Sequence, residues 1–262
     1  MFTGNGPFVS ATEWSLETSR IMDGILLGHL RLVPDRLKHA PSSALQQQWL
    51  TQDEIVRMRN FRQFPDQWRM LAGRALLRGC LHDHFCIAFA DFAFGEHNKP
   101  ILANAVNFDP IDFNLTHDRH HVIAAFSLNY DVGVDVACVD DFHSWEEFAD
   151  GYLDPREISW VRKAGRDSGA WRALRLWTLK EAILKSTGHG LDIDPRELVL
   201  DPDSPSPVVL IPHALPRACA FRLREWRCGA SAGAALASVS RTFDRSAYPY
   251  GAAGFCPTRF QR

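Results

Sequence analysis

The chain lacks the features that mark several common protein classes. Its 262 residues include only six cysteines, and no two of them form a CxxC pair or fall at zinc-finger spacing. The first residues, MFTGNGPFVSATEWS, contain neither the basic nor the apolar segment of a secretory signal. No apolar run reaches the roughly 18 residues that a membrane-spanning helix needs. We therefore expect a cytoplasmic protein with free thiols and no membrane segment.

The sequence also lacks an excess of positive charge. It has 29 lysines and arginines against 31 aspartates and glutamates, which gives a net charge of −2. Without a basic field to gather phosphates, nucleic-acid binding is disfavoured, although a local basic patch would suffice for a small phosphorylated ligand. No GxGxxG or Walker motif opens a helix after a strand, which argues against Rossmann and P-loop folds.

The hydrophobic pattern predicts two halves of mixed structure. After Pro65, apolar side chains recur at helical spacing, with Asp66 as the expected N-cap, and the period then changes to the alternation of short strands. The expected helices are residues 50–59, 66–85, 144–148, 156–163 and 171–187, and the expected strands are residues 24–33, 89–94, 112–115, 121–126, 132–136, 198–200, 220–226 and 234–240. Residues 1–18 have the composition of a loose leader. We expect an α+β fold with an N-terminal lobe of residues 1–130 and a C-terminal lobe of residues 131–262.

Two acidic residues occur in otherwise apolar segments. Asp135 lies among valines in the predicted strand VGVDV, and Glu181 lies in the long predicted helix. Trp177, Glu181 and Lys185 are spaced i, i+4, i+8, so they form one stripe that suits the edge of a cleft. If the two carboxylates converge, they suit Mg2+, which binds one or two carboxylates together with water and phosphate oxygens. Taken singly, each is equally well explained as an exposed charge.

Cations from separate segments are candidates for binding phosphate. Arginine forms paired hydrogen bonds with phosphate, and lysine acts as a point charge. The candidates are Arg57, Arg69, Arg74, Lys99, Lys180 and Lys185, although each alone is better explained as a surface charge. His117 opens the segment HDRHH, but adjacent His120 and His121 point to opposite sides of an extended chain. A hydrogen bond from His117 to a phosphate or hydroxyl is therefore favoured over a zinc site.

Taken in order, these segments resemble the Sfp-type 4'-phosphopantetheinyl transferases. The motifs are DFNLTH (112–117), VGVDV (132–136) and LWTLKEAILKSTGHGL (176–191), which are specific in combination and weak singly. NKP (98–100) is similar to the family's GKP with Asn98 in place of glycine, and DEIVR (53–57) and DQWRMLAGRALLR (66–78) are similar to its N-terminal half. The likeness covers about residues 50–200 and is greatest to the human-like subgroup, the aminoadipate-semialdehyde dehydrogenase phosphopantetheinyl transferases.

The resemblance implies a fold and an activity. The fold would be a monomer of two pseudo-twofold-related lobes, each a small antiparallel sheet packed by helices, with coenzyme A in the cleft between them. The activity would be Mg2+-dependent transfer of 4'-phosphopantetheine from coenzyme A to a serine of an acyl or peptidyl carrier protein, with adenosine 3',5'-bisphosphate as the other product. Mn2+ is an alternative metal.

The matching motif positions also imply roles for individual residues. Asp135 and Glu181 would bind the metal, and Glu181 and Lys185 would be catalytic. The coenzyme A contacts would be Arg57, Arg69, Lys99, Thr116, His117, Lys180 and Lys185, with the two last lysines near the pyrophosphate. Many relatives carry a further acid two residues after the first, where this chain has Ala137, and this bears on metal affinity and metal choice. The alternatives are a non-catalytic relative that binds coenzyme A or carriers, and an unrelated metal-dependent hydrolase.

Overall fold

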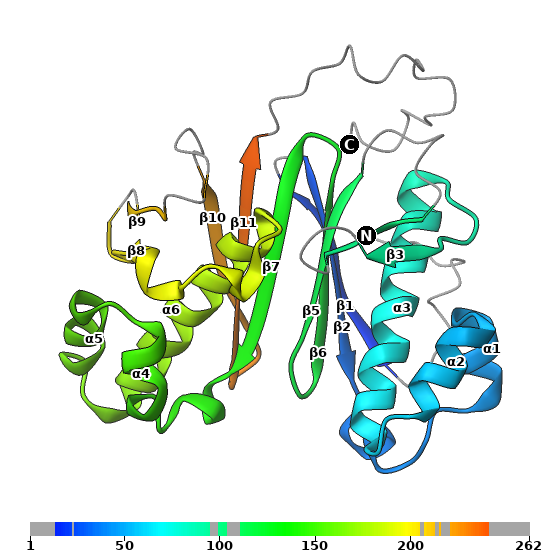
Figure 1. The fold of residues 1–262 in the computed structure, drawn as a ribbon. Helices are drawn as coiled ribbons and strands as arrows, with labels where there is room; N and C mark the ends of the chain where they lie inside the picture. The colour runs from blue at the N-terminus through cyan, green and yellow to red at the C-terminus, as the bar shows by residue number, and fades with distance from the viewer. Residues whose placement is uncertain are drawn as a thin grey trace.

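The computed structural model has two lobes, each a small antiparallel sheet with one long helix packed on it (Figure 1). It describes residues 14–22, 24–94, 99–103, 111–204, 207–212, 215 and 221–240. The two main sheets lie side by side at the centre, and the long helices α3 (Phe64–Phe85) and α6 (Arg166–Ser186) lie on opposite sides of them. This arrangement confirms the predicted fold class.

The N-terminal lobe is built on a four-stranded sheet in the order β1-β2-β6-β5, with every pair antiparallel. Its strands are β1 (Trp14–Met22), β2 (Ile25–Leu32), β5 (Asp112–His117) and β6 (His121–Ser127). Beside it lie the 3-10 helix Pro34–Lys38, α1 (Ser43–Trp49), α2 (Gln52–Arg59) and the hairpin of β3 (Phe92–Phe94) and β4 (Pro100–Leu102). Helix α3 packs closely on β2 at Gly28, where a Cβ atom would lie 2.8 Å from Leu76 Cδ1.

The C-terminal lobe is built on a three-stranded antiparallel sheet in the order β10-β11-β7. Its strands are β7 (Tyr130–Cys138), β10 (Arg222–Cys228) and β11 (Ala232–Ser240). With α6 lie α4 (Glu146–Tyr152), α5 (Pro155–Arg162), the 3-10 helices Val139–Phe142, Gly190–Asp192 and Pro195–Glu197, and the short pair β8 (Val199–Leu200) and β9 (Val208–Leu210). Asp154 caps α5 through a capping box that includes Glu157.

An apolar core joins the lobes, because successive side chains along a strand point to opposite faces of its sheet. Leu26 of β2 packs in the core with α3, whereas its neighbour Leu27 packs in a third core with residues of β7 and β11. Along β7, Val132 and Val134 face this third core, so Gly133 and Asp135 face α6.

Strands β5 and β7 lie next to each other, and side chains of β5 bind the backbone of β7. Asp112 accepts a hydrogen bond from the Val132 amide at 2.6 Å, and Asn114 accepts one from the Val134 amide at 3.0 Å. These two β5 residues therefore fix the position of β5 relative to β7. Thr116 is the next alternate residue of β5, so its side chain also points toward β7.

Several predictions for single segments need correction. Residues 14–22 form β1 instead of a loose leader, because β2 offers them an antiparallel partner. Helix α3 begins at Phe64 with Gln63 as its N-cap, not at Asp66, because Pro65 is tolerated in the first turn, where its missing N–H is not needed. Of the strand expected at 89–94, only β3 forms, and α1 was not predicted. The expected N-terminal leader before residue 14 lies outside the described residues.

Candidate active site at the junction of the lobes

The site begins with a close contact between β7 and α6. At Gly133 a Cβ atom would overlap the carbonyl oxygen of Ala182 and the amide nitrogen of Ser186, so only glycine lets the helix approach the strand this closely. Asp135 lies two residues further along β7 and so faces the same helix. The glycine of the VGVDV motif thus brings the aspartate of that motif against the charged stripe of α6.

Lys185 lies between the two predicted metal ligands. Its Nζ is 2.6 Å from Asp135 Oδ1 and 3.6 Å from Glu181 Oε2. Burial acts to lower the pKa of Lys185, but the two carboxylates outweigh it, and the pKa lies above its ordinary value. Lys185 is therefore a firmly protonated ammonium, and 26% of its side chain remains exposed.

Asp135 is buried and only half satisfied. Its Oδ1 accepts hydrogen bonds from Lys185 and, at 3.1 Å, from Thr116 Oγ1. Its Oδ2 is buried and has no hydrogen-bond partner in the part of the chain that the structure describes. Burial raises the pKa of Asp135 above its usual value, and the attraction of Lys185 offsets only part of that effect. Folds rarely leave a buried carboxylate oxygen unpaired, so Oδ2 is well suited to ligate a metal cation.

Tyr152 holds one carboxylate oxygen of Glu181, and Lys185 lies near the other. The Tyr152 hydroxyl donates a hydrogen bond of 2.7 Å to Glu181 Oε1, and Glu181 Oε2 faces Lys185. Two carboxylates therefore share one ammonium, which leaves a net negative charge that favours a divalent cation. Within the described residues, no group of three or more His, Cys, Asp or Glu side chains could hold a metal ion, so Asp135 and Glu181 offer a pair of ligands. Ala137, on the same face of β7 as Asp135, packs against the core of the C-terminal lobe.

The N-terminal lobe contributes three of the predicted residues. Thr116 is buried and donates to Asp135, so the structure places it beside a predicted metal ligand. His117 follows it at the end of β5, and Arg69 of α3 pairs with Asp66. The pKa of His117 lies below its usual value because the protein desolvates the ring and because the charges of Arg69 and Lys185 act on it. Arg69 and Lys185 therefore supply positive charge near the carboxylates, and His117 is an uncharged ring that can still form hydrogen bonds.

Lys99 lies at the junction of the lobes in a different role from the one predicted. Its Nζ donates to Asp112 Oδ2 at 2.7 Å and to the carbonyl oxygen of Val132 at 3.4 Å. Lys99 also lies near Gly188, just beyond the end of α6. In this structure it completes the bridge between β5 and β7, while a coenzyme A contact stays a prediction.

Lys180 is separated from the site although it precedes Glu181 in sequence. Its side chain is completely buried, and Nζ donates to Glu157 Oε2 at 2.6 Å and to the carbonyl oxygens of Pro195 at 2.9 Å and Tyr152 at 3.2 Å. An ammonium has three N–H donors, and all three are used here. This geometry leaves no donor of Lys180 for a ligand, while the predicted coenzyme A contact stays a prediction.

The other predicted cations of the N-terminal lobe belong to a network on α2 and α3. Arg74 binds Glu54 Oε1 at 2.6 Å, and buried Arg78 binds Glu54 Oε2 at 2.7 Å. Arg57 is exposed in the last turn of α2, and its charge acts on Arg74. Arg74 and Arg78 therefore stabilise the packing of α2 on α3, and the role of Arg57 stays a prediction.

The histidines of the HDRHH segment do not gather. His121 is buried, and its Nδ1 lies 2.9 Å from Nε2 of His29 on β2. His117 lies at the opposite end of the β5–β6 turn, next to the carboxylate site. This agrees with the preference for a hydrogen-bonding role over zinc.

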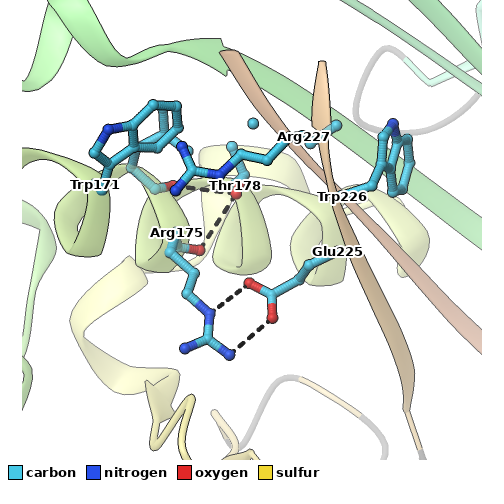
Figure 2. A pocket seen from close by; sticks show the side chains of 9 residues that line it. Trp171, Arg175, Thr178, Glu225, Trp226 and Arg227 are labelled. Carbon is cyan, nitrogen blue, oxygen red and sulfur yellow. Dashed lines mark hydrogen bonds and ion pairs between the residues drawn. The ribbon is translucent and has the colours of Figure 1, made fainter. Parts of the chain in front are cut away.

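A cavity of about 310 Å3 lies elsewhere, between α6 and β10 (Figure 2). Trp171 and Arg227 stack at its rim, and Arg175 forms a two-bond ion pair with Glu225. None of the predicted site residues lines it. The carboxylate site at the junction of the lobes is therefore separate from this cavity.

Sequence reasoning missed three residues that shape the site. Asp112 and Asn114 had a usable signal, because polar residues alternate through DFNLT and so share one face with Thr116. Tyr152 had no such signal, because its contact with Glu181 depends on how α4 packs on α6.

Among the helices that the structure describes, none has the length and apolarity needed to cross a membrane.

Comparison with known proteins agrees with this geometry. The family model for the 4'-phosphopantetheinyl transferase superfamily matches residues 131–238, and the model for the 4'-phosphopantetheinyl transferase N-terminal region matches residues 40–128. The 4'-phosphopantetheinyl transferase HetI of Nostoc is 29% identical over 62% of this chain and 70% of that protein. The 4'-phosphopantetheinyl transferase gsp of Aneurinibacillus migulanus is 28% identical over 55% of this chain and 58% of that protein.

One solved structure also aligns, a holo-(acyl-carrier-protein) synthase from Bacillus anthracis in complex with CoA (3',5'-ADP). It has a TM-score of 0.37 and 14% identity, over 44% of this chain and 99% of that chain. Membership rests on the two family models, which match adjacent parts of the chain and meet where β6 leads into β7. The chain belongs to the 4'-phosphopantetheinyl transferase superfamily.

Proposed function

We propose that this protein transfers 4'-phosphopantetheine from coenzyme A to a serine of an acyl or peptidyl carrier protein. The observation that carries the proposal is the cluster of Asp135, Lys185 and Glu181, in which a buried Asp135 oxygen lacks a partner. The cluster lies within residues 131–238, which the family model matches, and Arg69 adds positive charge near the uncharged ring of His117. Carboxylates for a metal and cations for phosphates are the groups that a phosphoryl-type transfer needs.

Asp135 and Glu181 are the residues that would hold Mg2+. The residues present fit this ion, because Oδ2 of Asp135 is unpaired and because carboxylate oxygens are the ligands of a hard cation. When bound, the ion would neutralise charge on the pyrophosphate oxygens of coenzyme A. Ala137 provides no further acid, so substrate oxygens and water would complete the coordination.

The residues of this chain then have distinct tasks. The serine Oγ forms a bond to the β-phosphorus of coenzyme A while the bond from that phosphorus to the bridging oxygen breaks. Glu181 accepts the serine proton, and Lys185 neutralises the charge that develops on the departing adenosine 3',5'-bisphosphate. His117 and Arg69 bind the 3'-phosphate side of coenzyme A, with Arg57 and Lys99 at other phosphate or adenine positions.

The test uses purified protein, coenzyme A, MgCl2 and a panel of apo carrier proteins from fatty-acid, polyketide and nonribosomal-peptide pathways. Intact-mass spectrometry should show the gain of one phosphopantetheine group on at least one carrier, and EDTA should abolish it. No mass gain on any carrier would refute the transferase. Binding of coenzyme A without transfer would favour a non-catalytic relative, and release of bisphosphate without a carrier would favour a hydrolase.

A further inference from the structure

We propose that Tyr152 is a positioning residue for Glu181, fixing one carboxylate oxygen so that the other faces the reacting groups. This inference rests on the proposed function for its chemistry, but its geometry stands on contacts within the C-terminal lobe. Tyr152 is the last residue of α4, which lies on the far side of Glu181 from Lys185.

Three contacts fix Tyr152 itself. Its hydroxyl donates to Glu181 Oε1 at 2.7 Å, and its ring stacks on Trp177 with centroids 4.1 Å apart and an interplanar angle of 20°. Its backbone carbonyl accepts a hydrogen bond from Lys180 Nζ. Because Trp177 precedes Glu181 by one helical turn, a single stretch of α6 holds both the ring and the carboxylate that the hydroxyl binds. The hydroxyl therefore has a defined position before any ligand arrives.

The hydroxyl can act only as a donor in this place. Tyr152 is 7% exposed, and its hydroxyl lies 2.7 Å from Oε1 of Glu181, a carboxylate oxygen that can only accept. A neutral phenol beside a carboxylate donates its proton to the hydrogen bond and keeps the carboxylate oxygen in place. Oε1 is thus engaged, and Oε2 is the oxygen on the side of Lys185 and Asp135.

Without this bond, Glu181 would lose the partner that selects its orientation. A glutamate side chain has several rotamers, and a partner behind a metal ligand or base typically changes affinity or rate by about 10- to 100-fold. Tyr152 should therefore affect turnover and the response to Mg2+, and leave the affinity for coenzyme A unchanged, because the residue is buried and its hydroxyl already binds Glu181.

The experiment compares wild type with Tyr152→Phe, which keeps the ring and removes the hydroxyl. We expect kcat to fall about 10-fold or more and the Mg2+ concentration for half-maximal rate to rise by a similar factor, with KM for coenzyme A within about twofold. Independently of turnover, EDTA-treated protein titrated with MgCl2 in the presence of coenzyme A should need more Mg2+ to reach its full rise in Tm. Tyr130→Phe is the matched control, because the Tyr130 hydroxyl accepts a hydrogen bond from Arg222 and, among the described residues, none from the carboxylate site.

A second variant, Trp177→Phe, keeps the Tyr152 hydroxyl and weakens the stack beneath it. It should shift the same two Mg2+ readouts by a smaller factor, and it decides the matter if Tyr152→Phe does not fold. Unchanged kcat and unchanged Mg2+ dependence in the folded variants would overturn the positioning role, even if Tm falls. A wild-type protein that modifies no carrier would instead refute the proposed function, and the thermal titration would still report on Tyr152.

Discussion

Helix α6 carries two lysines, five residues apart, whose surroundings differ in every respect that matters. Lys180 and Glu157 form a pair in which both side chains are completely buried, and Glu157 also accepts from the amides of Asp154 and Leu200. Lys185 is partly exposed and shares two carboxylates, one of which has an unpaired oxygen. The first cluster has a partner for each of its polar atoms, and the second does not.

This difference separates a structural ion pair from a reactive site. A buried pair with complete hydrogen bonding has no capacity left for a ligand, so its role is to fix α5, α6 and β8 together. A cluster with an unpaired oxygen and an excess of negative charge can still bind a cation. The pKa directions agree: burial dominates at Lys180 and lowers its pKa, whereas the carboxylates dominate at Lys185 and raise its pKa.

The largest expected effect comes from breaking the fully hydrogen-bonded pair of Lys180 and Glu157. Lys180→Met leaves Glu157 as a buried charge without its main partner, so we expect a loss of about 3–5 kcal/mol in the free energy of unfolding. Urea denaturation followed by circular dichroism measures it. Because all three donors of Lys180 Nζ bind protein oxygens, KM for coenzyme A should not change.

The matched control for this variant is the double substitution Glu157→Gln with Lys180→Met. It removes both charges while the glutamine oxygen can still accept from Leu200, so it should regain much of the lost stability. A single variant as stable as wild type would contradict the structural role of the pair, and a large rise in KM for coenzyme A would show that Lys180 serves the ligand.

Substitution in the cluster of Asp135, Glu181 and Lys185, which has an unpaired oxygen, should lower turnover and not stability. Asp135→Asn keeps the shape of the proposed metal ligand and removes its charge, so we expect turnover to fall by about 100- to 1000-fold. Its stability should not fall, because the variant no longer ionises a buried carboxylate. Initial rates and thermal unfolding of the same samples measure both. If the variant unfolded readily and kept its rate, the Asp135 cluster would be structural, like the pair of Lys180 and Glu157.

The pH dependence sharpens the same comparison. The folded-state pKa of Asp135 lies above its unfolded value of 3.8, so ionising Asp135 costs stability at pH values above the folded pKa. That cost disappears as the pH falls toward 3.8, because the native protein then binds the proton. The stability gain of Asp135→Asn over wild type should therefore be greatest near neutral pH and shrink in acid, as thermal scans across that range would show. A gain that grew in acid would contradict the raised pKa.

The same contrast explains what the sequence could and could not predict. Asp135, Glu181 and Lys185 were identified because a helical stripe and a strand motif define them locally. Lys180 was predicted to contact coenzyme A from the motif that it shares with Glu181, yet successive helical residues point in directions about 100° apart, and Lys180 contacts Glu157 instead of the carboxylate site. Its true partner, Glu157, lies on α5, and no local pattern reports the packing of α5 on α6.

The fold shows the same limit. The long helices and central strands follow from periodicity, because their apolar faces repeat over many residues. The first strand was missed because its sequence, WSLETSRIM, is largely polar and becomes a strand only through pairing with β2. Tyr152 was missed for a similar reason, since its hydroxyl meets Glu181 only after α4 has docked.

The smallest expected effect tests where Thr116 belongs. The sequence placed it among the coenzyme A contacts, whereas the structure has its hydroxyl donate to Asp135 Oδ1. Thr116→Val keeps the shape and removes the donor, so we expect the free energy of Mg2+ binding to weaken by about 1 kcal/mol. This would appear as a less than tenfold rise in the Mg2+ concentration for half-maximal rate. Thr116→Ser keeps the hydroxyl and should behave like wild type. If Thr116→Val instead raised KM for coenzyme A and left the Mg2+ dependence unchanged, Thr116 would face the nucleotide, and the Asp135 cluster would lack its support from the N-terminal lobe.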